Sequence, residues 1–150
     1  MFNLQELQVV KEHKIPLKLF VFNNFGYSMI RISQENLFNK RLAGSTTESG
    51  ISFPEFKQVS DTFGFNHTLI RNKEDLAKVK EPLSSNRPEL IEIVMDPEQK
   101  YFPRLATNKL PNGTLISPPL EDLDPKIELA VLEDLLGYKA HMNSYKARGL

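Results

Sequence analysis

The feature that most constrains the fold is the run Leu17 to Phe22, six residues of which five are large and apolar. A continuous apolar run of this length is typical of a strand that is covered on both faces. At 150 residues and 40% hydrophobic content, the chain is long enough to build one core around such a strand. The run therefore predicts a buried strand in a sheet that helices cover.

Helical and strand patterns alternate along the chain on either side of this run. Capping-box spacing, Ser or Asn followed three residues later by Glu, occurs at Asn3 with Glu6 and at Ser52 with Glu55. Apolar spacing and turn residues predict the following elements: helices at 3–13, 29–38, 52–63 and 73–80, the last capped by Asn72, and strands at 67–70 and 90–94.

Alternation with short connections predicts the α/β class, with a mainly parallel sheet and helices on both faces. From Asp96 to Asp124, prolines and polar turns predict an extended segment that lies over a surface. Residues 127–136 predict a terminal amphipathic helix that ends at Gly137. We expect an α/β domain over residues 1–95 and a C-terminal extension, residues 96–150, that packs on it.

Composition excludes several classes of protein. The 19 Lys and Arg residues balance the 19 Asp and Glu residues, which argues against a nucleic-acid partner. The absence of cysteine excludes disulfides, thiolate metal sites and cysteine nucleophiles. No apolar run is long enough to span a bilayer, and the first residues do not form a secretory signal. We expect a cytoplasmic protein without a membrane partner.

The segment Asn23 to Tyr27 follows the apolar run, where a parallel sheet binds ligands. Two carboxamides supply neutral oxygens for a hard cation, and Gly26 permits a close approach of the main chain, so that a carbonyl can complete the coordination. Such a site suits Mg²⁺ that bridges a phosphorylated ligand. By residue preference alone, an ordinary turn is the commoner outcome.

Other candidates carry less weight. His13, His67 and His141 are widely spaced, which favours surface or helix-end roles over metal binding. Tyr27 either lines the loop or packs with its hydroxyl at the rim, and packing is favoured. Ser28 and Arg31 either face a phosphate from the next helix or are solvated.

Three segments in order, Asn3–Leu7, Leu19–Phe22 and Asn23–Tyr27, resemble the diphosphate-binding domain of thiamine-diphosphate-dependent enzymes related to acetolactate synthase. The run Leu110–Asp122 resembles the tail of acetolactate-synthase-like proteins associated with surface-polysaccharide pathways. The resemblance implies an incomplete thiamine-diphosphate-binding fold over residues 1–95. The implied cofactor-binding loop and its roles are these: Asn24 as side-chain ligand of Mg²⁺, Gly26 as carbonyl ligand, Asn23 as support of the loop, and Phe25 and Tyr27 as its other members.

The same resemblance implies thiamine diphosphate and Mg²⁺ as cofactors and a 2-oxo acid as substrate, in decarboxylation or carboligation. It also implies a complementary pyrimidine-binding domain or subunit, and a homo-oligomer when the protein is full length. No catalytic acid or base is assigned within these residues.

The sequence departs from the family in one respect. The family's Gly-Asp-Gly triplet does not occur here, and by the family's spacing it would fall just upstream of Met1. We therefore expect an N-terminally truncated fragment of a lyase or transferase, inactive on its own, that lacks the charged protein ligand of Mg²⁺. Two alternatives stay open: a non-catalytic remnant or interaction module that retains the scaffold, and an incomplete gene record.

Overall fold

A computed structural model of the chain describes residues 3–150. It divides into two compact units, of which the first ends at Gln99 and the second begins at Lys100. Each unit is described by itself below, and the packing of the C-terminal extension on residues 1–95 stays a prediction. Within residues 3–150, no helix is long and apolar enough to cross a bilayer.

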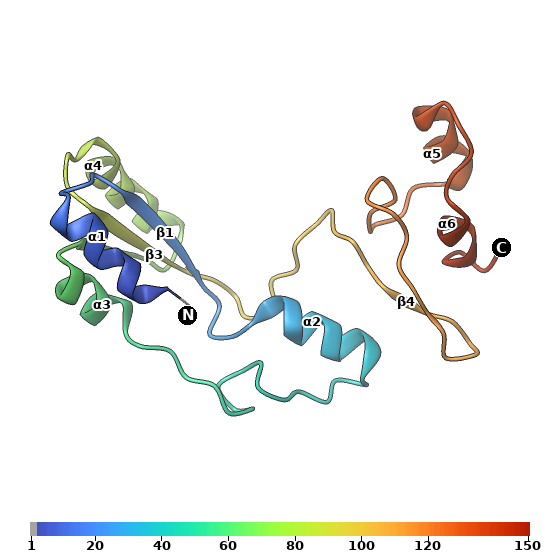
Figure 1. Cartoon of the computed structure of the whole chain (residues 1–150), viewed down its shortest axis with the longest axis horizontal. Coiled ribbons are helices and arrows are strands. Elements are labelled where there is room, and N and C mark those ends of the chain that lie inside the picture. Colours follow the sequence, from blue (N-terminus) through green and yellow to red (C-terminus); the bar gives the residue numbers. More distant parts are fainter. Residues whose placement is uncertain (1–2) are drawn as a thin grey trace. The chain divides into compact units, whose positions relative to one another are not determined.

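The first unit is a three-stranded parallel sheet with helices around it (Figure 1). The strand order is β1-β3-β2, so the last strand of this unit is the central one. This arrangement confirms the predicted α/β class. Its elements are η1 (Leu4–Glu6), α1 (Leu7–Glu12), β1 (Lys18–Asn23), α2 (Ser28–Leu37), α3 (Phe56–Phe63), β2 (Asn66–Ile70), η2 (Lys73–Val79), α4 (Lys80–Ser84) and β3 (Glu89–Val94).

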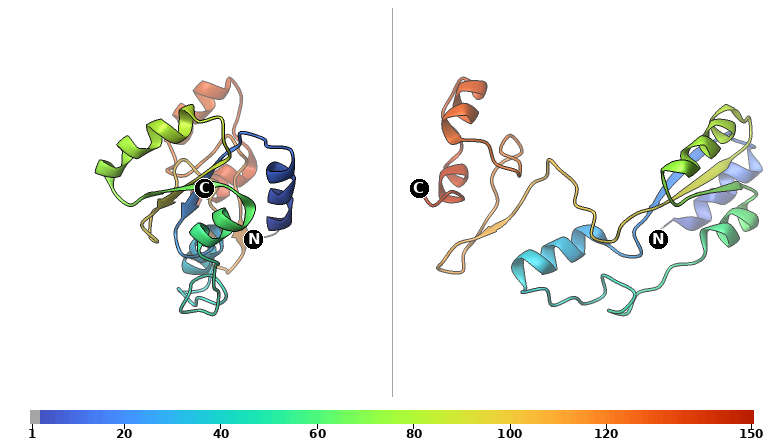
Figure 2. Two further views of the ribbon diagram at one scale, coloured as in Figure 1. Left: turned by 90° about the vertical axis from the view of Figure 1, so that its left-hand side faces the viewer. Right: turned by 180° about the vertical axis from the view of Figure 1, so that it is seen from behind.

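The core of this unit lies between one face of the sheet and helices α1 and α3. Leu90, at the centre of β3, is 1% exposed and packs with Phe56 and Phe65. Leu7 and Val10 of α1 close the same cluster. Seen from behind, η2 and α4 lie in front of the sheet and α1 and α3 lie behind it (Figure 2). Helices on both sides therefore leave the ends of the strands as the place where loops meet.

The predicted strand at Leu17–Phe22 is observed one residue later, as β1. Its side chains are not equally covered, because Phe22 is 61% exposed on the face opposite Leu19 and Val21. Within the described residues, the run is therefore buried on the α1 side only. A continuous apolar run does not by itself distinguish these cases.

Two of the three predicted helix caps are wrong. Asn3 has a left-handed backbone (φ 67°) and makes no side-chain cap, because a 3₁₀ turn gives the Glu6 N–H to the Asn3 carbonyl instead. Helix α3 begins after Glu55, whose extended backbone places Ser52 too far upstream to cap it. The third prediction is confirmed, since the Asn72 side chain accepts a hydrogen bond from the Asp75 N–H at 3.0 Å.

The second unit contains a short hairpin, β4 (Asn108–Lys109) with β5 (Leu115–Ile116), and two helices, α5 (Leu129–Leu136) and α6 (Met142–Lys146). The predicted terminal helix corresponds to α5, which ends at Gly137 with φ 74°. The hairpin and α6 were not predicted. Both are too short to show a hydrophobic period in the sequence.

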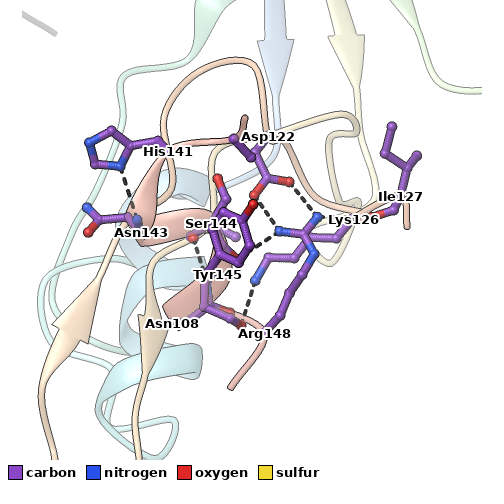
Figure 3. A network of polar contacts seen from close by, with 12 residues as sticks. Asn108, Asp122, Lys126, Ile127, His141, Asn143, Ser144, Tyr145 and Arg148 are labelled. Atoms are coloured by element: carbon purple, nitrogen blue, oxygen red, sulfur yellow. Dashed lines mark hydrogen bonds and ion pairs between the residues drawn. The ribbon is translucent and has the colours of Figure 1, made fainter. Parts of the chain in front are cut away.

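A polar network holds α6 against the segment before α5 (Figure 3). Both terminal nitrogens of Arg148 donate to the Asp122 carboxylate, at 2.6 and 2.8 Å, and Asp122 is only 2% exposed. Arg148 also donates to the carbonyls of Ser144 and Ile127. Because the pair is bidentate and nearly buried, it fixes the geometry of this unit more firmly than a surface ion pair would.

Candidate functional site

The predicted site loop lies where β1 ends and α2 begins. Asn23 is the last residue of β1, and Tyr27 immediately precedes α2. The loop between them is exposed at Phe25 and partly buried at Asn24 and Gly26. All five residues therefore stand together at the carboxyl end of the sheet, where β3 also ends, at Val94 opposite Asn23.

Both asparagine side chains fold the loop back on itself. Asn23 Oδ1 accepts the Phe25 N–H, and Asn24 Oδ1 accepts the Gly26 N–H, each at 3.2 Å. Each side chain thus bonds the main chain two residues on, which is the asparagine turn that competes with regular structure. Phe25 has φ 54°, an unusual conformation for a bulky residue, and these turns support it.

Gly26 is required by a close contact with another loop segment. It lies opposite Thr46 in an isolated antiparallel bridge, and the Tyr27 N–H donates to the Ser45 carbonyl at 2.9 Å. A Cβ atom on Gly26 would lie 2.5 Å from the Ser45 carbonyl oxygen, so any other residue would force the two segments apart. In the same segment as Ser45, hydrogen bonds from its own backbone N–H and from the Thr46 hydroxyl lower the pKa of Glu48.

A hollow of about 350 Å³ opens beside the loop. Its walls are apolar, with Leu7, Val21 and Phe53 among them, and Asn24 and Gly26 stand at its polar border. A mostly apolar hollow with a few polar groups is the usual form of a small-molecule site. Asn24 and Gly26 are therefore among the residues that line this hollow.

Within the described residues, the side chains of Tyr27 and Arg31 make packing and ion-pair contacts inside the first unit. The Tyr27 ring meets Phe53 edge-on, with ring centroids 5.5 Å apart, which agrees with the favoured packing role. Arg31 is buried on α2, and its Nε lies 3.8 Å from the Glu35 carboxylate. Its guanidinium is thus engaged within its own helix.

A polar cluster that the sequence analysis did not single out lies behind the loop. Glu92 Oε1 accepts from Asn23 Nδ2 at 2.7 Å, and Glu92 Oε2 lies 2.9 Å from His67 Nε2. Glu92 interrupts the apolar strand 90–94, and a charge inside a buried strand was the available signal. The expected surface or helix-end role of His67 is wrong, because His67 lies in β2 with a side chain that is 10% exposed. Its partner Glu92 lies on a neighbouring strand, so spacing along the sequence could not reveal it.

Residues 1–93 match the family model described as "Thiamine pyrophosphate enzyme, C-terminal TPP binding domain". The match covers more than half of the chain. It includes the complete site loop and the three-stranded sheet of the first unit, apart from the last residue of β3. The chain belongs to this family. Thiamine diphosphate, with Mg²⁺ as its usual partner, is the cofactor that goes with this domain.

Relatives of this thiamine-diphosphate-binding domain include acetolactate synthase subunits. The chain is 28% identical to the acetolactate synthase large subunit of Cyanidium caldarium over 108 residues, which cover 71% of this chain and 18% of that protein. It is 29% identical over 104 residues to the isozyme 2 large subunit of Escherichia coli (strain K12), covering 69% of this chain and 18% of that protein.

A third relative extends the likeness over most of the chain. The chain is 28% identical over 139 residues to the probable acetolactate synthase large subunit of Methanocaldococcus jannaschii, covering 90% of this chain and 22% of that protein. The domain thus spans about a fifth of the length of the curated relatives that it matches. It is a thiamine-diphosphate-binding C-terminal domain of the acetolactate-synthase-like type.

The loop fits part of the magnesium coordination expected in this family. An amide oxygen has two lone pairs, so Asn24 Oδ1 retains one for a cation while it accepts the Gly26 N–H. The metal-ligating atoms that the loop offers are neutral oxygens, which suit Mg²⁺ beside a diphosphate that brings its own negative charge. Among residues 3–150, no group of three or more His, Asp or Glu side chains is gathered to hold a metal ion.

Proposed function

We propose that this domain binds the diphosphate end of thiamine diphosphate through Mg²⁺ and serves an acetolactate-synthase-like enzyme that acts on 2-oxo acids. Asn24 Oδ1 and the Gly26 carbonyl are the protein ligands of the metal, and Asn23, Phe25 and Tyr27 complete the loop. The single observation that carries the proposal is the placement of Asn24 and Gly26 at the border of the hollow, at the carboxyl end of β1.

When bound, the cofactor supplies the electron sink for decarboxylation of the 2-oxo acid. The residues of this chain bind and orient it. The Asn24 amide and the Gly26 carbonyl place neutral oxygens where the phosphate charge is balanced, and the free N–H groups at the start of α2 favour the same anion. Leu7, Val21 and Phe53 give the hollow apolar walls against which the cofactor packs.

The proposal includes partners that lie outside the described contacts. A complementary pyrimidine-binding domain or subunit completes the active site, and the full-length protein is a homo-oligomer. The neutral loop donors leave room for a charged ligand from a Gly-Asp-Gly segment, which the family places just before the equivalent of η1.

Calorimetric titration with thiamine diphosphate tests the assignment of Asn24. We expect Mg²⁺-dependent binding that Asn24→Ala weakens at least tenfold, about 1.4 kcal/mol, because the substitution removes a metal ligand and the loop bond to Gly26. The matched control is Asn86→Ala, an exposed asparagine just before β3, at the opposite end of the sheet. An affinity equal to that of the unsubstituted chain would reject Asn24 as a ligand.

A second function is favoured by one observation: the metal-ligating oxygens proposed in the loop, those of Asn24 and Gly26, are neutral and, among the described residues, have no charged ligand beside them. A scaffold that keeps the α/β fold but holds no cofactor would be a non-catalytic remnant or interaction module. The same titration decides between the two. Absence of binding both by this chain and by a longer polypeptide that carries an upstream Gly-Asp-Gly segment would establish the second function.

A further inference from the structure

Three polar side chains from three neighbouring strands meet on one face of the sheet. Val21 of β1, Glu92 of β3 and Leu69 of β2 stand in register. Asn23 lies two residues after Val21, and His67 lies two residues before Leu69. Because side chains alternate with a period of two, Asn23, Glu92 and His67 all project from the same face.

Glu92 is a nearly buried carboxylate whose two oxygens are both occupied. Its side chain is 12% exposed, and that of His67 is 10% exposed. Oε1 accepts from Asn23 Nδ2 at 2.7 Å, and Oε2 lies 2.9 Å from His67 Nε2. A carboxylate in such surroundings is costly unless it is fully bonded, so these two donors are what hold it there.

The carboxylate dictates which way the Asn23 amide points. An ionised carboxylate only accepts hydrogen bonds, so the Asn23 amide must turn its Nδ2 toward Glu92. Oδ1 then faces the loop, where it accepts the Phe25 N–H at 3.2 Å. Phe25 has φ 54°, which a bulky residue adopts only when its surroundings enforce it. Glu92 is thereby linked, through one side chain, to the strained residue next to Gly26.

We propose that Glu92 is a positioning residue for the magnesium-binding loop, with His67 as its second anchor. This inference rests on the proposed function of Asn24 and Gly26. Glu92 fixes Asn23, Asn23 holds Phe25, and the Gly26 carbonyl is presented to the metal as a result. Glu92 acts on the loop through Asn23, to which it is hydrogen-bonded, and not through Asn24 or Gly26.

Charged residues around the cluster do not replace this link. Glu92 and His67 line a second hollow of about 660 Å³, which Glu55, Lys57 and Arg71 also border. Lys57 is bonded to Asp61 on its own helix, at 2.5 Å. Lys57 and Arg71 side chains only donate hydrogen bonds, and the Glu55 carboxylate accepts from Gln58 Nε2 at 3.1 Å. Within residues 3–150, Glu92 is the acceptor that the structure shows for Asn23 Nδ2, so its removal leaves this amide N–H without that bond.

The chain provides a matched control on the same strand. Glu89, the first residue of β3, is 3% exposed and accepts from Asn66 Nδ2 at 2.8 Å. It lies three residues before Glu92, so it projects from the opposite face at the far end of the strand. Glu89→Leu removes a buried carboxylate with an asparagine partner, as Glu92→Leu does, without touching the loop.

The experiment uses the whole ¹⁵N-labelled chain and has two readouts. The first is the backbone order parameter at Phe25 and Gly26 in the absence of ligand. The second is the affinity for thiamine diphosphate with Mg²⁺. In Glu92→Leu we expect the order parameter to fall from about 0.85 to below about 0.6. We expect the affinity to weaken about tenfold, the effect of losing one charge-assisted hydrogen bond.

The conservative variant separates positioning from charge. Glu92→Gln keeps an oxygen that accepts from Asn23, so we expect it to retain the order parameter and to bind within about threefold of the unsubstituted chain. Glu89→Leu should leave both readouts unchanged.

Each contrary outcome has a distinct meaning. Unchanged order and affinity in Glu92→Leu, or equal losses in Glu89→Leu, would overturn the role of Glu92 and leave the proposed function standing. Loss of order in Glu92→Leu, together with no cofactor binding by the unsubstituted chain and none by a longer polypeptide with an upstream Gly-Asp-Gly segment, would reject the proposed function. The link from Glu92 to the loop would then be confirmed as structural, and its role in metal binding would be refuted.

Discussion

At the scale of single residues, Gly26 is the position where the loop tolerates least change. The Ser45 carbonyl lies so close that a Cβ atom would be 2.5 Å from its oxygen, and both partners are backbone. We expect Gly26→Ala to destabilise the first unit by about 1–3 kcal/mol, the usual cost of overpacking. It should also weaken binding of thiamine diphosphate with Mg²⁺, because the loop must move. Urea unfolding followed at amides of β1 and β3 measures the first effect, and calorimetry measures the second.

Gly113→Ala is the control for this prediction. Gly113 has φ 85° and open space where a Cβ would stand, so its cost is backbone strain alone, about 1 kcal/mol, and falls on the second unit. If Gly26→Ala left β1 and β3 as stable as before, the close contact with Ser45 would be refuted as the reason for glycine at this position.

At the scale of elements, two carboxylates hold the end of the chain: Asp122 pairs with Arg148 just after α6, and Glu133 of α5 accepts from the Tyr145 hydroxyl of α6. The Arg148 guanidinium lowers the pKa of Asp122 below its ordinary value of 3.8. The pKa of Glu133 is lowered from 4.5 to about 2, first by the Tyr145 hydroxyl, then by the Ala140 N–H and Lys139. Each folded-state pKa lies below the unfolded one, so folding releases protons. The stabilisation is therefore complete above the unfolded pKa and is lost as the pH falls through the folded pKa.

We expect the second unit to lose stability as the pH falls from about 4.5 to about 2. Urea unfolding followed at the Ser144 amide measures this, and Asp122→Asn should flatten part of the pH dependence because its titration is removed. The control is Asp134→Asn, an exposed carboxylate on α5. A second unit equally stable at pH 5 and pH 2 would contradict the role assigned to the Asp122 and Glu133 carboxylates.

At the scale of the whole molecule, the described residues, 3–150, place no titratable side chain in the lining of the hollow beside the loop. We expect no detectable decarboxylation of pyruvate by the purified chain with thiamine diphosphate and Mg²⁺. Release of CO₂ is the measurement. Turnover by this chain alone would refute its assignment as a binding portion that requires a complementary domain.

The sequence by itself determined the class of the fold and the place of the loop. Patterns as local as the run at 17–22 and the stop at Gly64 predicted β1 and the end of α3 within one residue. Local signals succeed there because period and turn chemistry act between near neighbours in the chain. The caps at Asn3 and Ser52 failed for a related reason: the spacing of two residues does not state the backbone angles between them.

Only the tertiary structure decided what supports the loop. Glu92 and His67 stand 25 residues apart in the chain, and Asn23 stands 69 residues from Glu92. Parallel pairing brings all three together, and register, which no local period encodes, decides which side chains share a face. The need for glycine at position 26 likewise arises from a carbonyl 19 residues away, at Ser45. Short-range patterns determine elements, whereas contacts between distant segments exist only once the chain has folded.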